Sequence, residues 1–196
     1  MFTGIIQNLG EVVNFSDGEL EISTQLDLND CKIGSSIACN GVCLTVTEIK
    51  QIDGNFLFKV NLGEETQYRT NFSPDLFNKI IKINIEKSLK IGEEISGHFV
   101  YGHIDRTTKI NKINELKNSW EFYFENFHNQ DSRFIVEKAS ICINGISLTI
   151  AKVENKFFSI SIIPHTFENT NLKYLKLNDI VNVEFDYLAR FTKRLL

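Results

Sequence analysis

Two short segments of the sequence carry polar and nucleophilic side chains at the same spacing. The decapeptide IACNGVCLTV recurs later in the chain as ICINGISLTI, so Cys43 and Thr45 in the first copy match Ser147 and Thr149 in the second. Thiol and hydroxyl groups can act as nucleophiles or as hydrogen-bonding partners of a polar ligand. The repetition therefore predicts two similar ligand sites that differ where cysteine stands in place of serine.

Strand geometry decides which way these side chains point. Each segment has an Asn-Gly pair between two apolar runs, which predicts a β-hairpin because a type I′ turn needs positive φ at both positions. Side chains alternate along a strand, so Cys43 and Thr45 should share one face and Leu44 and Val46 the other. A small barrel fills its interior with apolar side chains, so the polar row should lie outside. The alternative is a solvated outer face on which threonine serves only β propensity.

Other motifs repeat in the same order, which predicts two homologous halves. MFTG at the start matches FVYG, IIKINIEKSL resembles DIVNVEFDYL, and Asn71 matches Asn171. A repeat of about 100 residues is the size of a small domain and is longer than the repeat unit of a solenoid protein. We expect an N-terminal barrel over 1–88, a C-terminal barrel over 89–186 and a terminal helix over 187–196.

The predicted fold is all-β, with two similar small closed barrels of Greek-key type in tandem. Runs such as LTVTEI, FLFKVNL and SWEFYFENF are short and rich in β-branched and aromatic residues. A short helix should open at Ser73 with a proline in its first turn, and ENTNLKYL should form its counterpart. Asp186 should cap a final helix whose Leu188, Phe191 and Leu195 share one face, and so short a helix must pack on something.

Composition argues against several classes of function. The 196 residues carry a formal net charge of -4 and scattered basic side chains, so no nucleic acid partner is expected. The start of the chain has neither a basic segment nor a long apolar run, so neither a signal peptide nor a membrane span is expected. The four cysteines lack C-x-x-C spacing and fit no zinc pattern, so they should be free thiols of a cytoplasmic protein without a metal.

A family resemblance rests on several of these motifs together. MFTGII, the pair NGVCLTV and NGISLTI, SGHFVYGHID, and IPHTFENTNL followed by VNVEFD resemble riboflavin synthases of the two-barrel, homotrimeric kind, from residue 1 to about 188. The resemblance implies a cofactor-free dismutation of two 6,7-dimethyl-8-ribityllumazine molecules. One transfers a four-carbon unit to the other, giving riboflavin and 5-amino-6-ribitylaminouracil. It also implies self-association as a homotrimer and admits association with lumazine synthase.

The resemblance also implies roles for individual residues. Cys43 is a candidate nucleophile or ligand contact, Ser147 is its counterpart, His103 a proton-transfer group and Asp186 a carboxylate near the site. Phe2 belongs to the N-terminal segment that reaches the site, where an aromatic ring could stack on a flat heterocycle. The implied substrate-binding residues are Phe2, Thr3, Gly4, Thr45, Glu65, Thr66, His98, Gly102, Lys138, Thr149 and Thr166.

Plainer alternatives stand beside these roles. Cys43 could be a small packing residue, Asp186 only a helix cap and His98 a structural hydrogen-bonding residue. His165 stands where the family analogy has an acidic residue, which leaves recognition at that edge open. The alternative function is a non-catalytic lumazine- or flavin-binding antenna protein. Such relatives tend to lose residues of the second site and of the His and Asp set, all present here, which favours the enzyme.

Three points stay open at the level of sequence. The residues do not tell which barrel binds the donor and which the acceptor. They do not tell whether Cys43 forms a covalent adduct. The family resemblance favours a site between the N-terminal barrel of one subunit and the C-terminal barrel of the next, but the residues themselves allow a site within one chain.

Overall fold

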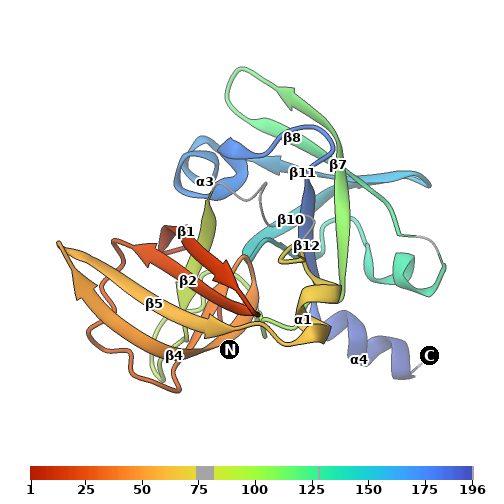
Figure 1. Ribbon diagram of the computed structural model, residues 1–196. Coiled ribbons are helices and arrows are strands. Elements are labelled where there is room, and N and C mark those ends of the chain that lie inside the picture. The colour runs from red at the N-terminus through yellow and green to blue at the C-terminus, as the bar shows by residue number, and fades with distance from the viewer. Residues whose placement is uncertain (74–81, 128, 196) are drawn as a thin grey trace.

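The chain forms two closed antiparallel barrels in tandem, shown in the computed structural model of Figure 1, which describes residues 1–73, 82–127 and 129–195. The first barrel closes in the order β1-β2-β5-β4-β3-β6. Its strands are β1 (Asn8–Ser16), β2 (Glu19–Thr24), β3 (Ser36–Cys39), β4 (Val42–Ile52), β5 (Asn55–Asn61) and β6 (Ile83–Lys87). The expected all-β fold of two small closed barrels is confirmed.

The second barrel repeats the topology of the first. Its strands are β7 (Arg106–Glu115), β8 (Trp120–Glu125), β9 (Ser140–Ile143), β10 (Ile146–Val153), β11 (Phe157–Ile162) and β12 (Ile180–Phe185). They close in the order β10-β11-β8-β7-β12-β9, which is the cyclic order of the first barrel with each strand replaced by its counterpart. The two halves of the sequence therefore fold alike, as the repeated motifs predict.

Tight Asn-Gly turns open the strands that carry the repeated segments. Asn40 and Gly41 have φ values of 46° and 79°, and Asn144 and Gly145 have 46° and 83°. These positive values are those of a type I′ turn. The turns join β3 to β4 and β9 to β10, so both predicted hairpins are confirmed.

Each barrel encloses its own apolar core. Phe58 is fully buried in the first barrel, where Leu44 and Val46 also point inward, as the alternation of β4 predicts. Phe122 and Phe158 are fully buried in the second. Burial of a large side chain contributes about 1.5–3 kcal/mol, so these two clusters account for much of the stability of the barrels.

The helices in the described ranges of the chain are short. They are α1 (Glu64–Arg69), the 3₁₀ helix η1 (Asn129–Phe134), α3 (Pro164–Asn169), the 3₁₀ helix η2 (Asn171–Tyr174) and α4 (Tyr187–Leu195). The helix expected after Ser73 falls outside the described residues. Its counterpart begins earlier than expected, because Pro164 favours the first helical turn, and it breaks at Thr170 before η2. No helix in the described parts of the chain is long and apolar enough to span a membrane.

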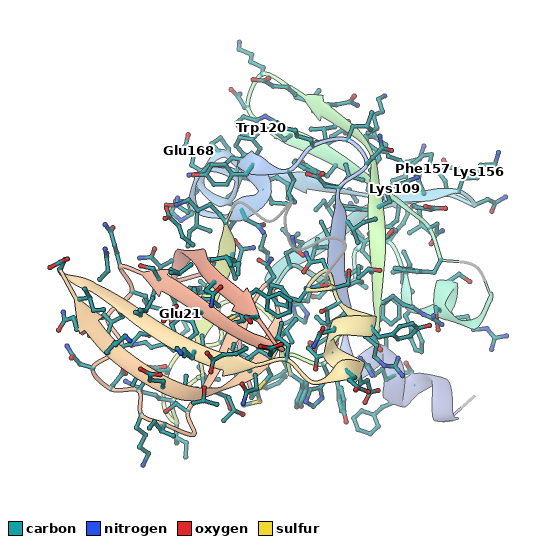
Figure 2. The ribbon with its side chains drawn as sticks, in the orientation of Figure 1. Glu21, Lys109, Trp120, Lys156, Phe157 and Glu168 are labelled. Atoms are coloured by element: carbon teal, nitrogen blue, oxygen red, sulfur yellow. The ribbon has the colours of Figure 1, made fainter. Side chains whose placement is uncertain are left out.

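Stacked aromatic rings hold α3 against the second barrel. Phe167 of α3 lies parallel to Trp120 of β8, with ring centroids 3.9 Å apart and planes 4° from parallel. Figure 2 places Trp120 beside the helix that carries Glu168. The stacking fixes the segment that leads from α3 to Asn171.

The C-terminal helix α4 begins at a capping residue. The side chain of Asp186 accepts a hydrogen bond from the amide of Leu188 at 2.9 Å, so the expected cap is confirmed. Leu188 is 70% exposed and Phe191 58% exposed. This apolar face of α4 is therefore largely uncovered within one chain.

Contacts at the start of α4 tie it to the second barrel. Arg190 forms an ion pair with Asp105, whose carboxylate also accepts the backbone amide of Phe185 at 2.9 Å. The ring of Tyr187 packs on that of Tyr101, with centroids 4.4 Å apart. The helix is thus anchored by its inner side and leaves its outer side free of these contacts.

Six buried asparagines join the two barrels. The side chain of Asn84 accepts the backbone amide of Asn171 at 2.7 Å and donates to the side chain of Asn171 at 2.9 Å. Asn182 makes the same pair with Asn71, at 2.7 and 3.0 Å. Figure 1 shows the reason: α1 of the first half lies toward the second barrel, and α3 of the second half toward the first. The six are Asn40, Asn71, Asn84, Asn144, Asn171 and Asn182.

The two Asn-Gly turns meet at the centre of this junction. A Cβ atom added to Gly41 would lie 2.6 Å from the backbone nitrogen of Gly145, and one added to Gly145 would lie 2.7 Å from that of Gly41. Only residues without a side chain allow the two backbones to approach so closely. The turns that open the polar strands are therefore also the contact between the barrels.

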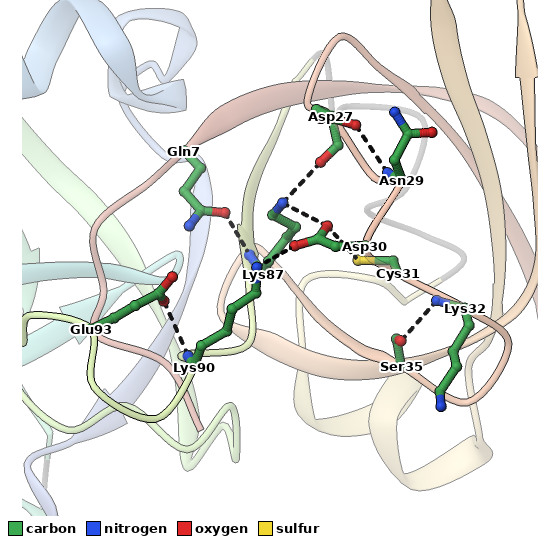
Figure 3. Close-up of polar contacts among 10 residues, drawn as sticks. All are labelled: Gln7, Asp27, Asn29, Asp30, Cys31, Lys32, Ser35, Lys87, Lys90 and Glu93. Atoms are coloured by element: carbon green, nitrogen blue, oxygen red, sulfur yellow. Dashed lines mark hydrogen bonds and ion pairs between the residues drawn. The ribbon is translucent and has the colours of Figure 1, made fainter.

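A polar cluster fixes the end of β6 (Figure 3). The ammonium group of Lys87 pairs with Asp30 at 2.8 Å, and its backbone amide donates to the side chain of Gln7 at 2.9 Å. Hydrogen bonds from Lys87 and Lys90 hold the pKa of Asp30 well below its usual range. The cluster secures the strand that carries Glu86.

Candidate active site

The repeated polar residues lie on the outer face of each barrel, as predicted. Thr45 and Thr149 are exposed, whereas Cys43 and Ser147 are half-buried. Both half-buried residues are covered by segments that precede the first strand of the opposite barrel. We refer to residues 2–4, before β1, as the first strap and to residues 100–103, before β7, as the second strap.

The second strap covers Cys43 of the first barrel. The amide of Cys43 donates to the carbonyl of Gly102 at 2.9 Å. Gly102 has a φ of 80°, and a Cβ added to it would lie 2.4 Å from the Cβ of Cys43, so only glycine permits this approach. His103 follows directly and has an exposed side chain. We refer to Cys43, Thr45, Gly102 and His103 as the Cys43 site.

The first strap covers Ser147 of the second barrel in the same way. The amide of Ser147 donates to the carbonyl of Gly4 at 2.8 Å, and a Cβ added to Gly4 would lie 2.7 Å from the Cβ of Ser147. In addition, Nδ1 of His98 lies 2.7 Å from the hydroxyl oxygen of Ser147. We refer to Ser147, Thr149, Gly4 and His98 as the Ser147 site.

The electrostatics of the Ser147 site favour a neutral imidazole. Burial lowers the pKa of His98, and the nearby negative charge of Asp186 opposes this shift only in part. A neutral ring can accept a proton from the Ser147 hydroxyl or donate its own hydrogen, depending on the tautomer. The cap residue of α4 therefore also acts on the imidazole that contacts Ser147, which brings three predicted site residues together.

The four cysteines differ in their chemistry, and all are free thiols. Cys39 and Cys142 are fully buried, and burial raises the pKa of both thiols above the ordinary value. Such thiols are poor nucleophiles at neutral pH. Cys43 is only half-buried and lies on the outer strand face, so it is the cysteine of the repeated segments that a ligand could reach.

The aromatic residue of the first strap is enclosed. Phe2 is fully buried in a small cluster with Ala38, Val100 and Cys142. Its amide donates to the carbonyl of Val100 at 2.7 Å, and the amide of Val100 donates back at 3.0 Å, so the two straps pair with one another. Within one chain, Phe2 shapes the straps, and its stacking on a ligand stays a prediction.

The remaining predicted residues lie on α1, on α3 and in the turn before β9. Glu65 pairs with Arg69 on the surface of α1 at 2.8 Å. Thr66 and Thr166 occupy equivalent places on α1 and α3, where each carbonyl accepts the hydroxyl of the threonine four residues later at 2.7 Å. Lys138 is exposed with a φ of 68°. The side-chain ion pair of Glu65 and the carbonyl contacts of Thr66 and Thr166 are local, and the amide of Lys138 donates to the carbonyl of Ile150 at 2.9 Å. Contact of these residues with a ligand stays a prediction, as does the effect of the exposed His165.

Two buried carboxylates hold the straps, and neither is among the site residues expected from the sequence. Glu86 accepts the amide and hydroxyl of Thr3 at 2.7 and 2.9 Å and the amide of Gly4 at 3.0 Å. Glu184 accepts the amides of Tyr101, Gly102 and His103 at 2.7, 2.8 and 2.9 Å.

Burial acts on the ionisation of both carboxylates. It raises the pKa of Glu86 and raises the pKa of Glu184 to about 7, against the opposing effect of their hydrogen bonds. A sequence signal existed for these residues. The aligned segments INIEK and VNVEF place an asparagine and a glutamate at matching positions of otherwise apolar strands.

Comparison with known families agrees with this duplicated arrangement. The family model described as the lumazine binding domain matches the chain twice, over residues 3–88 and 101–186. These two matches correspond to the two barrels. Each also contains the strap amides that donate to a buried glutamate, and that glutamate itself.

Relatives extend the match to the whole chain. The riboflavin synthase of Buchnera aphidicola subsp. Baizongia pistaciae is 35% identical, with 98% of this chain and 90% of that one covered. Those of Actinobacillus pleuropneumoniae and Brucella abortus are each 36% identical, with 100% of this chain covered, and 90% and 98% of theirs.

A solved structure shares the fold. The crystal structure of LumP complexed with riboflavin matches with a TM-score of 0.78, at 23% identity, over 94% of this chain and 99% of that one. At this identity the likeness concerns the fold. The sequence relatives carry the assignment: the chain belongs to the riboflavin synthase family of enzymes, and its barrels are a duplicated lumazine-binding domain.

Proposed function

We propose that the protein converts two molecules of 6,7-dimethyl-8-ribityllumazine into riboflavin and 5-amino-6-ribitylaminouracil by transfer of a four-carbon unit. The observation that carries the proposal is the pair of matched sites, in which Cys43 and Ser147 occupy the same position under equivalent straps. A reaction between two identical molecules needs two similar sites that are not identical. Holding both molecules in reactive geometry can supply on the order of 7–11 kcal/mol of the barrier.

The residues of each site supply groups suited to such a reaction. In this proposal Cys43 acts as nucleophile or ligand contact, and Ser147 contacts the second ligand. His103, with its exposed imidazole beside Cys43, transfers protons at the acidic methyl group of the lumazine. Asp186 supports proton transfer through its charge near His98.

The substrate-binding set follows the strands, straps and helices that surround these groups. Thr45 and Thr149 are exposed beside Cys43 and Ser147 and could hydrogen-bond the heterocycle. The equivalent places of Thr66 and Thr166 support a role in the corresponding site of each half. The full set proposed is Phe2, Thr3, Gly4, Thr45, Glu65, Thr66, His98, Gly102, Lys138, Thr149 and Thr166.

We propose a homotrimer assembled through α4. The exposed Leu188 and Phe191 support self-association, because a short helix with an uncovered apolar face gains stability from a partner. The domain division over 1–88, 89–186 and 187–196 belongs to the same proposal. The four free thiols support a cytoplasmic location. An association with lumazine synthase is compatible with this location.

The alternative function is non-catalytic binding of a lumazine or flavin. The fold likeness to LumP favours it as the second candidate. The presence of Cys43, His103, Ser147 and Asp186 supports the enzyme instead. These side chains lie in or beside the two sites.

One experiment separates the two functions. The purified protein is incubated with 6,7-dimethyl-8-ribityllumazine alone, and the absorbance of riboflavin is followed together with release of 5-amino-6-ribitylaminouracil. The proposal expects one riboflavin for every two lumazines consumed. Tight binding of the lumazine without turnover would establish the antenna function and refute the enzyme.

A further inference from the structure

The two straps are held by one barrel and docked on the other. The first strap precedes β1, and its amides donate to Glu86 on β6 of the first barrel. The carbonyl of the same strap, at Gly4, accepts the amide of Ser147 in the second barrel at 2.8 Å. The strap is therefore anchored in the first barrel while it covers the polar residue of the second.

The second strap has the reciprocal arrangement. Its amides donate to Glu184 on β12 of the second barrel at 2.7 to 2.9 Å. Its carbonyl at Gly102 accepts the amide of Cys43 in the first barrel at 2.9 Å. Each site is thus completed by a backbone segment whose position is set by a carboxylate in the opposite barrel.

Burial of the two carboxylates costs free energy, which their hydrogen bonds must offset. Glu86 is 4% exposed and Glu184 2% exposed, and a buried charge is tolerated only when it is well hydrogen-bonded. Each receives three hydrogen bonds, all from its own strap. Strap and carboxylate therefore form one unit. Displacement of the strap leaves the carboxylate without these donors, and replacement of the carboxylate removes the acceptors that hold the strap.

We propose that Glu184 is a positioning residue for the Cys43 site and Glu86 a positioning residue for the Ser147 site, so that ligand binding at each site is controlled from the opposite barrel. The ligand class, a lumazine or flavin, rests on the proposed function; the crossed positioning rests on the hydrogen bonds. If the carboxylates served only general stability, loss of either one would affect both sites alike. Crossed positioning requires the effect to fall on one site.

The test uses the full-length protein with Glu184→Gln and Glu86→Gln as a reciprocal pair. Glutamine keeps the shape of the side chain but replaces an acceptor oxygen by a donor that faces the strap amides. Amide hydrogen exchange is measured by NMR at Cys43 and Ser147, whose amides are the docking contacts. Riboflavin is then titrated while the amide shifts of Thr45 and Thr149 report occupancy of each site. Glu154→Gln, an exposed glutamate, is the control.

The proposal makes opposite expectations for the two variants. Glu184→Gln should speed hydrogen exchange of the Cys43 amide and weaken the binding of riboflavin at the Cys43 site by about tenfold. The affinity of the Ser147 site should change by less than about twofold. Glu86→Gln should do the reverse. Equal changes at both sites, or no change at either, would overturn the proposal.

Two further variants keep the test decisive if a glutamine variant fails to fold. Gly102→Ala and Gly4→Ala leave both carboxylates in place and push one strap away from Cys43 or from Ser147. They should reproduce the same site-specific pattern. Should the wild-type protein not turn over the lumazine, the proposed function fails, but the exchange pattern still decides whether the positioning is crossed.

Discussion

Asn84 and Asn171 exchange two hydrogen bonds between the barrels, at 2.7 and 2.9 Å, although they lie in different halves of the chain. Asn84 sits on β6, two residues before Glu86, and Asn171 follows α3. The strand that positions the first strap is therefore the strand that receives the helix of the other half. Strand β6 thus contributes both to the contact between the barrels, through Asn84, and to the Ser147 site, through Glu86.

We expect Asn84→Ala to destabilise the protein by about 3 kcal/mol, because it leaves several buried partners without a hydrogen bond. These include the amide of Asn171 and the carbonyl of Asn144. Urea unfolding measures the loss. The exposed Asn155→Ala is the control, and an equal loss in both variants would contradict the importance of the junction.

Gly102→Ala should destabilise the protein more than Gly92→Ala. Both glycines have positive φ, 80° and 91°, so both variants carry similar backbone strain, but only the Cβ at residue 102 meets another residue, Cys43. We expect a difference of about 2 kcal/mol, measured by chemical unfolding of the two variants side by side. Equal stabilities would show that the second strap can move away from Cys43 without loss of folding free energy.

The stability of the protein should carry a pH dependence from Glu184. Burial raises its pKa in the folded state from 4.5 to about 7, and the charge of Asp105 adds to the shift. Between these pH values the folded state holds a proton that the unfolded state has lost. The contribution of Glu184 to the free energy of unfolding is thus largest below about pH 4.5 and is lost as pH rises through about 7.

Glu184→Gln provides the comparison, because glutamine does not titrate. The free energy of unfolding of the wild type, minus that of the variant, should fall as pH rises from about 4.5 through about 7 and level off only about one pH unit above that. Urea unfolding at several pH values measures it. A difference that grows with pH would contradict the prediction. It would mean that the hydrogen bonds to Glu184 lower its pKa by more than burial raises it.

Cys43→Ser should slow turnover much more than it weakens binding. The hydroxyl can replace a hydrogen bond of the thiol but is a poorer nucleophile at neutral pH. We expect kcat to fall about tenfold or more, with the lumazine dissociation constant changed less than about threefold. Cys31→Ser, outside both sites, is the control. Unchanged kcat would show that the thiol has no chemical role.

Replacing both Leu188 and Phe191 by aspartate should abolish the proposed trimer without unfolding the barrels. Both side chains are exposed in the single chain, so the charges cost little there and are costly only in an apolar interface. Analytical ultracentrifugation reads the assembly state. Leu177→Asp, at another exposed leucine, should leave it unchanged. A trimer that persists in the double variant would exclude α4 as its interface.

The periodic features of the fold could be predicted from sequence, because strand alternation and turn chemistry are local. The Asn-Gly pairs fixed both hairpins, and the alternation around Cys43 placed the thiol outside and Leu44 inside. The crossed contacts could not be predicted. Nothing local to Gly4 indicates that its carbonyl meets Ser147, since that contact depends on how the two barrels pack.

The partners of the buried polar residues could not be predicted from the sequence either. Asn84 and Glu86 in INIEK, with Asn182 in VNVEF, look like ordinary interruptions of apolar strands until their partners are known. Their recurrence in both halves was the available signal. A polar residue repeated at a position that should be apolar indicates a partner elsewhere in the fold.

The paired turns of Gly41 and Gly145 point to the ancestry of the chain. Gly41 contacts Gly145, its equivalent in the other half, and the surrounding contacts are reciprocal. In an isologous twofold dimer, the same surface of each subunit forms the interface in this reciprocal way. Fusing two such subunits makes their association intramolecular and frees the copies to diverge. Cysteine in one copy and serine in the other is a difference that no symmetric dimer of identical subunits could have carried.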